Sequence, residues 1–281
     1  MAAIDVSILV QALPYIRAFR DRTFVVKFGG ELTRDREHLE AIAEDLTLLE
    51  AVGIRLVAVH GGGPQANELS ELLGFKPQIV DGRRITDERA LEVAKMVFAG
   101  KINTEVLSAL RKHGGAGVGL SGVDAGIVKA RKRGVGAIDF GFVGDVDGVD
   151  TVLIDELVKL DYIPVISSLA ADDDGTILNV NADTIAAEIA IGLKAEKLLS
   201  MTTAKGVLGT DGQVISEMSA AEARQLIRDK VATSGMIPKL EACARAVEGG
   251  VKKAHIIDGL TRHALLAEVF TERGIGTMVT P

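Results

Sequence analysis

The stretch VVKFGG, residues 25–30, ends an apolar run (TFVVKF) that has the composition of a buried β-strand. A lysine near the end of such a strand is unusual, because burying an ammonium group is costly unless an anion meets it. The two glycines that follow let a ligand approach the backbone where side chains would block it. The stretch therefore predicts a strand whose end presents a cation and bare amides to an anion.

Working outward from this stretch, strand-like and helix-like segments alternate along the chain. Apolar strands are predicted at 55–60, 163–169, 196–202, 252–258 and 276–279, and helices at 36–53, 64–74, 88–114, 151–162, 183–195, 219–229, 236–250 and 262–272. Short β-like runs at 126–133 and 137–146 predict hairpins. The alternation predicts an α/β fold: an open, mainly parallel central sheet in an αβα sandwich, with two lobes, 23–180 and 181–281, sharing the sheet.

Residues 1–22 fall outside this alternation. Ile4, Ile8, Ile16 and Phe19 form a helical stripe that Pro14 should kink. Such an amphipathic helix has two uses, packing on its own domain or inserting between subunits to build an oligomer, and the residues leave both open.

The composition excludes several classes of protein. The 281 residues carry a net charge of -7 without a Lys/Arg block or any Trp, which argues against a nucleic-acid partner. No apolar run reaches the roughly 18 residues of a membrane span, and Asp5 stands where a secretory signal carries Lys or Arg. We therefore expect a cytoplasmic protein without a membrane partner. The one cysteine, Cys243, allows no intramolecular disulfide and is expected in a helical core.

Polar and glycine-rich clusters follow several predicted strands, where ligands of parallel sheets bind. Besides residues 27–30, His60 and three glycines precede a helix that opens at Pro64. Free amides at a helix start suit phosphate or carboxylate, although glycines can also serve only a tight connection. Further clusters are 82–87, 179–183 and 235–239. A single polar residue before a helix can be explained as an N-cap, without any binding role. Lys239, considered alone, can be explained as a lysine exposed to solvent.

One motif matches a dinucleotide-binding pattern but lacks the structural context of such a site. Residues 117–122 match G-x-G-x-x-G, but they lead into a β-like segment and not a long helix, which argues against NAD binding. The sequence contains no G-x-x-x-x-G-K-[ST] motif, no His pair with metal spacing and no Ser/His/Asp nucleophile context. We therefore expect no metal bound by protein ligands alone.

Taken in order, VVKFGG, HGGGPQANE, GRRIT, GLSG, LNVNAD and GMIPK resemble the motifs of the amino acid kinase family. Each motif is loose by itself, but the ordered set, from about residue 8 to the C-terminus, is specific. Within the family the likeness is to members that phosphorylate the side-chain carboxylate of N-acetyl-L-glutamate with ATP, in arginine biosynthesis.

The resemblance implies roles for residues at the strand ends. The catalytic residues would be Lys27 and Lys239, which contact the transferred phosphoryl group, and Asp183, which orients both lysines. The acetylated amino acid would be bound by Gly62, Gly63, Arg84 and Asn179, with Arg84 on its α-carboxylate. The nucleotide would be bound by Gly29, Gly30, Asn181, Thr203 and Gly206.

Thr203 departs from the family pattern, which usually has Asp at this position. The contacts of this residue with ATP are therefore expected to differ from those of other family members. The implied chemistry needs no general base, because the attacking carboxylate is already ionised at neutral pH. Bringing an anion up to ATP instead requires charge neutralisation, by Mg²⁺ held mainly by the nucleotide phosphates, two ammonium groups and backbone amides.

The chain ends resemble those of hexameric, arginine-inhibited members. The N-terminal helix would join dimers into a homo-hexamer, a trimer of dimers, and Glu268 and Gly274 would bind L-arginine. Without the resemblance, Glu268 would be taken for a solvated helix residue. Some relatives bind a P-II-type signalling protein, and the residues neither require nor exclude this partner.

Two rival functions stay open. One is a kinase for a related acid such as N-acetyl-aminoadipate, because one methylene is worth only about 1–3 kcal/mol in a pocket. The other is a non-catalytic arginine-sensing protein, which Thr203 favours and the retained Lys27, Asp183 and Lys239 oppose.

Overall fold

The computed structural model describes residues 7–80, 83–232, 235–271 and 274–281. Residues 1–6 of the predicted N-terminal segment, residues 81–82 and residue 272 of the last predicted helix lie outside these ranges. The centre of the fold is an eight-stranded sheet with the strand order β12-β14-β13-β11-β1-β2-β8-β5. All neighbouring strands run parallel except β13 and β14.

The strands of this sheet are β1 (Thr23–Phe28), β2 (Arg55–His60), β5 (Gly117–Ser121), β8 (Ile163–Ser167), β11 (Lys197–Thr202), β12 (Glu217–Ser219), β13 (Lys253–Asp258) and β14 (Thr277–Thr280). The predicted mainly parallel α/β sheet is confirmed. The strand order changes direction at β1, with β2, β8 and β5 on one side and β11, β13, β14 and β12 on the other.

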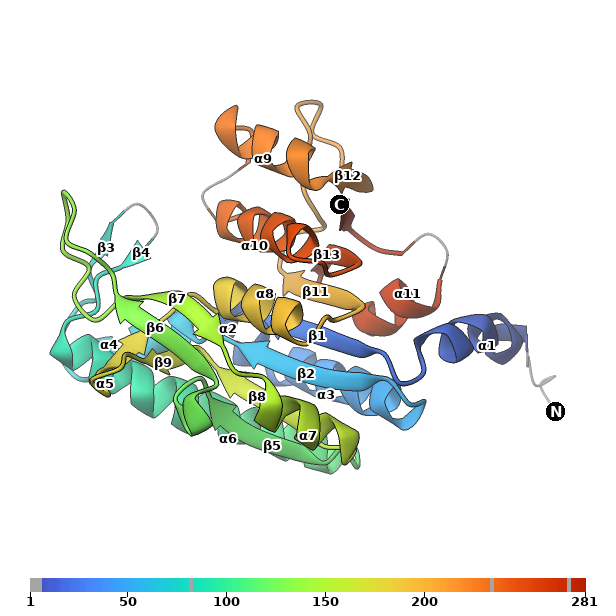
Figure 1. Cartoon of the computed structure of the whole chain (residues 1–281), viewed down its shortest axis with the longest axis horizontal. Coiled ribbons are helices and arrows are strands. Elements are labelled where there is room, and N and C mark those ends of the chain that lie inside the picture. The colour runs from blue at the N-terminus through green and yellow to red at the C-terminus, as the bar shows by residue number, and fades with distance from the viewer. Residues whose placement is uncertain (1–6, 81–82, 233–234, 272–273) are drawn as a thin grey trace.

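The central strands separate two apolar cores, because successive side chains along each strand point to opposite faces of the sheet. On β1, Phe24, Val26 and Phe28 belong to one core, and Val25 belongs to the other. Figure 1 shows α7 (Val152–Lys159) and α8 (Ala182–Gly192) in front of the sheet and α3 (Arg36–Ala51) behind it. The sheet is therefore the middle layer of an αβα sandwich.

The remaining helices complete these layers. They are α1 (Ser7–Phe19), α2 (Gly30–Arg34), α4 (Gly63–Leu72), α5 (Glu88–Ala94), α6 (Asn103–Lys112), α9 (Ala220–Arg228), α10 (Ile237–Glu248) and α11 (Ala264–Phe270). Cys243 is fully buried on α10 without a disulfide, as expected, and burial raises the pKa of its thiol to about 12.

The long helix predicted at 88–114 contains a surprise. It is one continuous helix, but the central segment η1 (Lys95–Ile102) is π-helical between α5 and α6. This segment packs on a glycine of the loop after β2: a side chain at Gly62 would collide with Phe98 and Ile102. π-Helical turns frequently occur at functional sites, and here one adjoins the loop of the second glycine cluster.

A smaller sheet, β10-β9-β6-β7, lies beside the main one. The hairpin expected from 126–133 and 137–146 is present as antiparallel β6 (Val128–Lys132) and β7 (Gly144–Val149). Strands β9 (Leu169–Ala171) and β10 (Ile177–Asn179) complete this sheet, and β3 (Ile79–Val80) and β4 (Arg83–Arg84) form a separate ribbon.

The G-x-G-x-x-G motif serves packing. It forms edge strand β5 and leads into the short 3₁₀ turn η2 (Asp124–Gly126). Side chains at Gly117 or Gly119 would collide with Leu107 on α6, so both glycines let this helix lie close to the strand.

Helix α1 lies at the edge of the molecule, beside α11 and apart from most of the sheet (Figure 1). Its last turn packs on the chain itself, because the ring centroids of Phe19 and Phe24 are 5.2 Å apart. Pro14 lies inside the helix, and Val10 and Leu13 remain exposed. The helix therefore packs on its own chain at one end and leaves apolar residues uncovered farther along.

Candidate active site

Three charged side chains from distant parts of the chain meet at the carboxyl end of β1. Nζ of Lys27 lies 2.8 Å from Oδ1 of Asp183, and Nζ of Lys239 lies 3.4 Å from Oδ2 of the same carboxylate. Lys27 and Asp183 are only 4% and 6% exposed. The structure thus brings together the three residues that were predicted to be catalytic.

Local structure explains why they converge. Side chains alternate along β1, so Lys27 points to the same face as Val25, where α8 packs. Asp183 lies in the first turn of α8, whose start is fixed because Oδ1 of Asn181 accepts hydrogen bonds from the amides of Asp183 and Thr184. Asn181 therefore has the capping role that its position before a helix allowed.

The other two contacts come from β11 and α10. Ser200 is the register partner of Lys27 on neighbouring β11, and its hydroxyl donates to Oδ1 of Asp183 at 3.4 Å. Lys239 lies in the first turn of α10, next to Pro238 at the helix start. Both oxygens of the carboxylate are thus held by neighbours.

Electrostatics keep this carboxylate ionised. Burial alone would raise the pKa of Asp183, but the ammonium groups of Lys27 and Lys239 outweigh burial and hold its pKa below the usual range. Burial and the like charge of Lys239 lower the pKa of Lys27, while Asp183 raises it in part. The cluster carries two positive charges and one negative charge, so its net charge attracts an anion.

Two cavities adjoin the cluster. The larger, of about 540 Å³, is lined by residues that include Gly61, Gly62, Gly63, Arg84, Arg133, Asn179, Asn181, Ala182 and Pro238. The smaller, of about 250 Å³, is lined by residues that include Gly29, Glu31, Thr203, Gly235 and Lys239. The cluster lies between them, since Lys239 lines one cavity and its neighbour Pro238 lines the other.

Arg84 lines the larger cavity. Its Nη2 donates to the carbonyl of Gly63 at 3.0 Å and to Asn67. Its Nη1 is buried and has no hydrogen-bond partner within the described ranges. A guanidinium group with a free donor suits a carboxylate. Asn179, whose amide donates to Thr86 at 3.1 Å, lines the same cavity, as does Arg133, which the sequence analysis missed.

The residues predicted to bind the nucleotide do not all line one cavity. Gly29 and the exposed Thr203 line the smaller cavity, whereas Gly30 packs against the loop after β2. Gly206 has φ of 151°, and a Cβ atom at this position would collide with Val214 and Thr277. Nucleotide binding by these residues stays a prediction.

His60, at the end of β2, was noticed only as part of a glycine cluster. It is fully buried, and burial lowers its pKa to about 4, so the ring is neutral. Its Nδ1 donates to the carbonyl of Gly61 at 3.1 Å, and its Nε2 accepts from the amide of Asn103 at 3.3 Å. Asn103 begins α6 directly after the π-helical segment, so His60 connects the glycine loop to that helix.

A third cavity, of about 660 Å³, lies at the amino ends of β11 and β13, and both predicted regulatory residues line it. Glu268 is buried: its Oε1 lies 2.7 Å from Nδ1 of His255, and its Oε2 accepts from the amide of Ile275 at 2.6 Å. A side chain at Gly274 would collide with this carboxylate. The cavity is also lined by residues that the sequence analysis did not select: Tyr15, Phe19, Lys197, Lys253 and His255.

Comparisons with known proteins agree with this arrangement. The sequence profile described as "Amino acid kinase family" matches residues 22–258. The acetylglutamate kinase of Thermosynechococcus vestitus is 48% identical over 277 residues, which cover 98% of this chain and 93% of the relative. The acetylglutamate kinase of Methanothrix thermoacetophila is 46% identical, with 97% of each chain covered.

Among solved structures, N-acetylglutamate synthase from Neisseria gonorrhoeae, in complex with coenzyme A and N-acetyl-glutamate, superimposes with a TM-score of 0.89 at 31% identity. The match covers 99% of this chain but only 63% of the synthase chain. The same synthase in complex with coenzyme A and L-arginine gives a TM-score of 0.85 at 30% identity, covering 98% of this chain and 65% of the synthase chain.

Proposed function

Because the chain belongs to the amino acid kinase family, we propose that it transfers the terminal phosphoryl group of ATP to the side-chain carboxylate of N-acetyl-L-glutamate. Full-length relatives at 46–48% identity carry the name acetylglutamate kinase, so the chain is a kinase of arginine biosynthesis. The observation that carries the proposal is the convergence of Lys27 and Lys239 on Asp183 between two cavities.

The chemistry follows from the charges. A substrate carboxylate oxygen attacks the terminal phosphorus, the bond to the leaving oxygen of ADP breaks, and an acyl phosphate forms. Nucleophile and ATP are both anionic, so their repulsion is the main obstacle. We assign Lys27 and Lys239 to neutralise the charge on the transferred group, and Asp183 to hold both ammonium groups in place. No proton has to be removed, so no general base is required.

We assign the larger cavity to the acetylated amino acid. The donor on Nη1 of Arg84 supports binding of the α-carboxylate, and the amide of Asn179 can contact the acetamido group. The backbone amides of Gly62 and Gly63, at the start of α4, would hold the reacting end. A methylene-longer acid such as N-acetyl-aminoadipate is the alternative substrate, and relative kcat/KM on the two acids decides between them.

We assign the smaller cavity to ATP, with Gly29, Gly30 and Thr203 beside the phosphates and ribose; Asn181 and Gly206 complete the proposed nucleotide set. The described residues contain no group of three or more His, Cys, Asp or Glu side chains that could hold a metal ion. The one carboxylate of the cluster, Asp183, is occupied by two lysines. Mg²⁺ would therefore be held by the nucleotide phosphates and would offset their charge.

We assign the third cavity to L-arginine as an inhibitor. Glu268 offers a carboxylate for a guanidinium group, Lys197 offers an ammonium group for the α-carboxylate, and Nε2 of His255 is buried without a partner within the described residues. The related synthase in complex with L-arginine supports this ligand. If the protein instead only senses arginine, a non-hydrolysable ATP analogue will not bind in calorimetry.

The exposed Val10 and Leu13 on α1 support association of subunits through this helix, and we propose a homo-hexamer, a trimer of dimers. A P-II-type partner stays a proposal on the resemblance alone.

Every helix in the described ranges is too short or too polar to span a bilayer. We propose that the enzyme works in the cytoplasm, where its biosynthetic relatives are expected to act.

The direct test traps the acyl phosphate with hydroxylamine. Wild-type protein with ATP, Mg²⁺ and N-acetyl-L-glutamate should give the hydroxamate, and Lys27→Ala should lower kcat by at least about 10²-fold, the effect of losing one preorganised charge-stabilising group. The matched control is Lys159→Ala, which removes an exposed lysine on α7. A Lys27→Ala enzyme with normal turnover would refute the assignment.

A further inference from the structure

The two glycine turns of the site touch each other directly. Gly30 follows β1, Gly62 follows the neighbouring β2, and the ends of these strands, Phe28 and His60, are in register. A Cβ atom on Gly30 would lie 3.0 Å from Cα of Gly62 and 2.8 Å from Cδ of Pro64. The turn after β1 therefore packs closely on the turn after β2, and a side chain at Gly30 would collide with Pro64 and Gln65.

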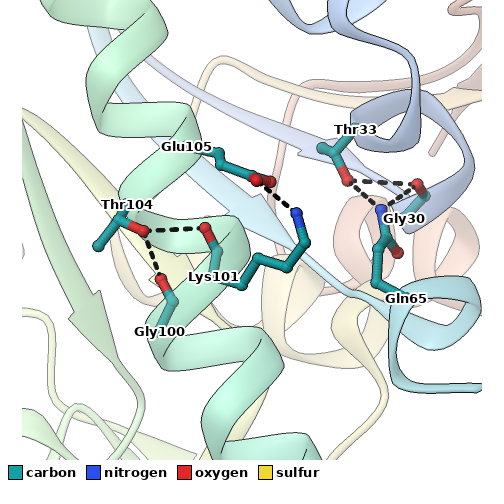
Figure 2. Close-up of polar contacts among 7 residues, drawn as sticks. All are labelled: Gly30, Thr33, Gln65, Gly100, Lys101, Thr104 and Glu105. Atoms are coloured by element: carbon teal, nitrogen blue, oxygen red, sulfur yellow. Dashed lines mark hydrogen bonds and ion pairs between the residues drawn. The ribbon is translucent and has the colours of Figure 1, made fainter. Parts of the chain in front are cut away.

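Gln65 joins these turns from behind. It follows Pro64 in the first turn of α4 and is 5% exposed. Its Nε2 donates to the carbonyl oxygen of Gly30 at 2.7 Å and to Oγ1 of Thr33 at 3.0 Å. The hydroxyl of Thr33 donates to the same carbonyl at 3.2 Å. Figure 2 shows this triangle of contacts among Gly30, Thr33 and Gln65.

We propose that Gln65, supported by Thr33, is a positioning residue that fixes the spacing between the two glycine turns, and with it the approach of the acceptor carboxylate to the phosphoryl group. The inference rests on the proposed function. Gln65 is covalently part of the helix that carries Gly63 and binds the carbonyl of Gly30, so movement of either turn must stretch a buried hydrogen bond. A displacement of about 1 Å costs on the order of 10²-fold in rate.

The triangle depends on donors at this place. Methionine has the length of glutamine but cannot donate, so Gln65→Met would leave the Gly30 carbonyl with one partner fewer. Thr33→Val removes the hydroxyl at nearly constant shape, and Thr33→Ser keeps it. Lys101 lines the same groove as Gln65 and Thr33, but its ammonium group faces Glu105, as Figure 2 shows. Lys101→Met is therefore a matched control.

The experiment measures kcat, both KM values and the melting temperature for these variants, at a temperature well below melting. Gln65→Met should lower kcat about 10- to 100-fold. Thr33→Val should lower kcat less, while Thr33→Ser and Lys101→Met should stay near wild type. If Gln65→Met does not fold, the contrast between Thr33→Val and Thr33→Ser carries the test.

A folded Gln65→Met enzyme with wild-type kcat and a lower melting temperature would overturn the inference, because Gln65 would then be only structural. Equal kcat for Thr33→Val and Thr33→Ser would overturn the part assigned to Thr33. Wild-type protein that forms no acyl phosphate from N-acetyl-L-glutamate would instead overturn the proposed function, and this inference with it.

Discussion

Two buried carboxylates, Asp183 and Glu268, lie at opposite ends of the strands of one sheet. Asp183 lies at the carboxyl end of β1, with each oxygen bound by a lysine. Glu268 lies near the amino ends of β11 and β13, paired with His255 and a backbone amide. Ligand sites of parallel sheets lie beyond the carboxyl ends of the strands, so the first end suits the chemistry. At the second end, where Glu268 lies, we propose regulation by L-arginine.

The comparison also separates two kinds of pairing. At the first end, Asp183 is paired with two lysines, which hold the pKa of its carboxyl group below the usual range. Histidine can be neutral, and burial lowers the pKa of His255 while Glu268 opposes that shift. The following changes test the difference, beginning with the largest expected effect.

Asp183→Asn should destabilise the fold by about 3–5 kcal/mol, because it leaves a buried lysine without its counter-charge. Urea unfolding of wild type and variant measures this loss. Glu268→Gln, which removes the charge at the other end, is the comparison. A loss below about 1 kcal/mol for Asp183→Asn would mean that the Lys27 pair is solvated in solution and not buried.

Lys239→Ala should lower kcat by about 10²-fold or more, because one of two charge-neutralising groups is lost. Steady-state kinetics with saturating ATP and N-acetyl-L-glutamate measures the effect. The side chain of Lys239 is less buried than that of Lys27, and the two like charges repel each other. Removing the ammonium group of Lys239 should therefore reduce the stability of the fold only slightly. Unchanged kcat would exclude Lys239 from the chemistry.

His60 should make stability depend on pH. Its pKa is lowered from 6.5 to about 4 by burial, so below 6.5 the unfolded chain binds a proton that the folded protein refuses. Its contribution to the free energy of unfolding is complete above the unfolded pKa and is lost as pH falls toward the folded pKa. By about pH 5 the loss should be about 2 kcal/mol, and His60→Gln should remove this slope.

The other buried histidine provides the contrast for this measurement. Glu268 raises the pKa of His255 and opposes the effect of burial, so His255→Gln should change the pH slope less than His60→Gln. Equal slopes for wild type and His60→Gln in urea unfolding at several pH values would show that His60 is hydrated.

Glu268→Gln should leave kcat without arginine within about twofold and weaken inhibition by L-arginine at least about tenfold, because a hydrogen bond to a charged group contributes about 1.5–3 kcal/mol. Inhibition curves over a range of arginine concentrations measure the shift. Loss of basal activity in this variant would mean that the two ends are not independent.

The sequence predicted much of the fold because apolar strands and capped helices are local patterns. It also predicted that Lys27, Asp183 and Lys239 act together, but through ordered motifs that resemble a family and not through geometry. What it missed depends on long-range packing. Lys197 and His255 were placed on strands, yet nothing local indicates that these strand starts share a cavity with α1.

The π-helical segment was missed for a related reason. Residues 88–114 have helical spacing throughout, so no local pattern distinguishes the wider π-helical turns from α-helix. The π-helical segment lies where the helix packs on Gly62. Gln65 was likewise quoted in a motif without a role, because the carbonyl that it binds belongs to a turn 35 positions earlier.

The most direct test of the account is a crystal structure with MgADP, N-acetyl-L-glutamate and aluminium fluoride as a mimic of the transferred group. The account predicts Nζ of Lys27 and Nζ of Lys239 both within about 3 Å of the mimic, with Asp183 still between them. Either ammonium group turned away from the mimic, with its nearest contact in solvent, would contradict it.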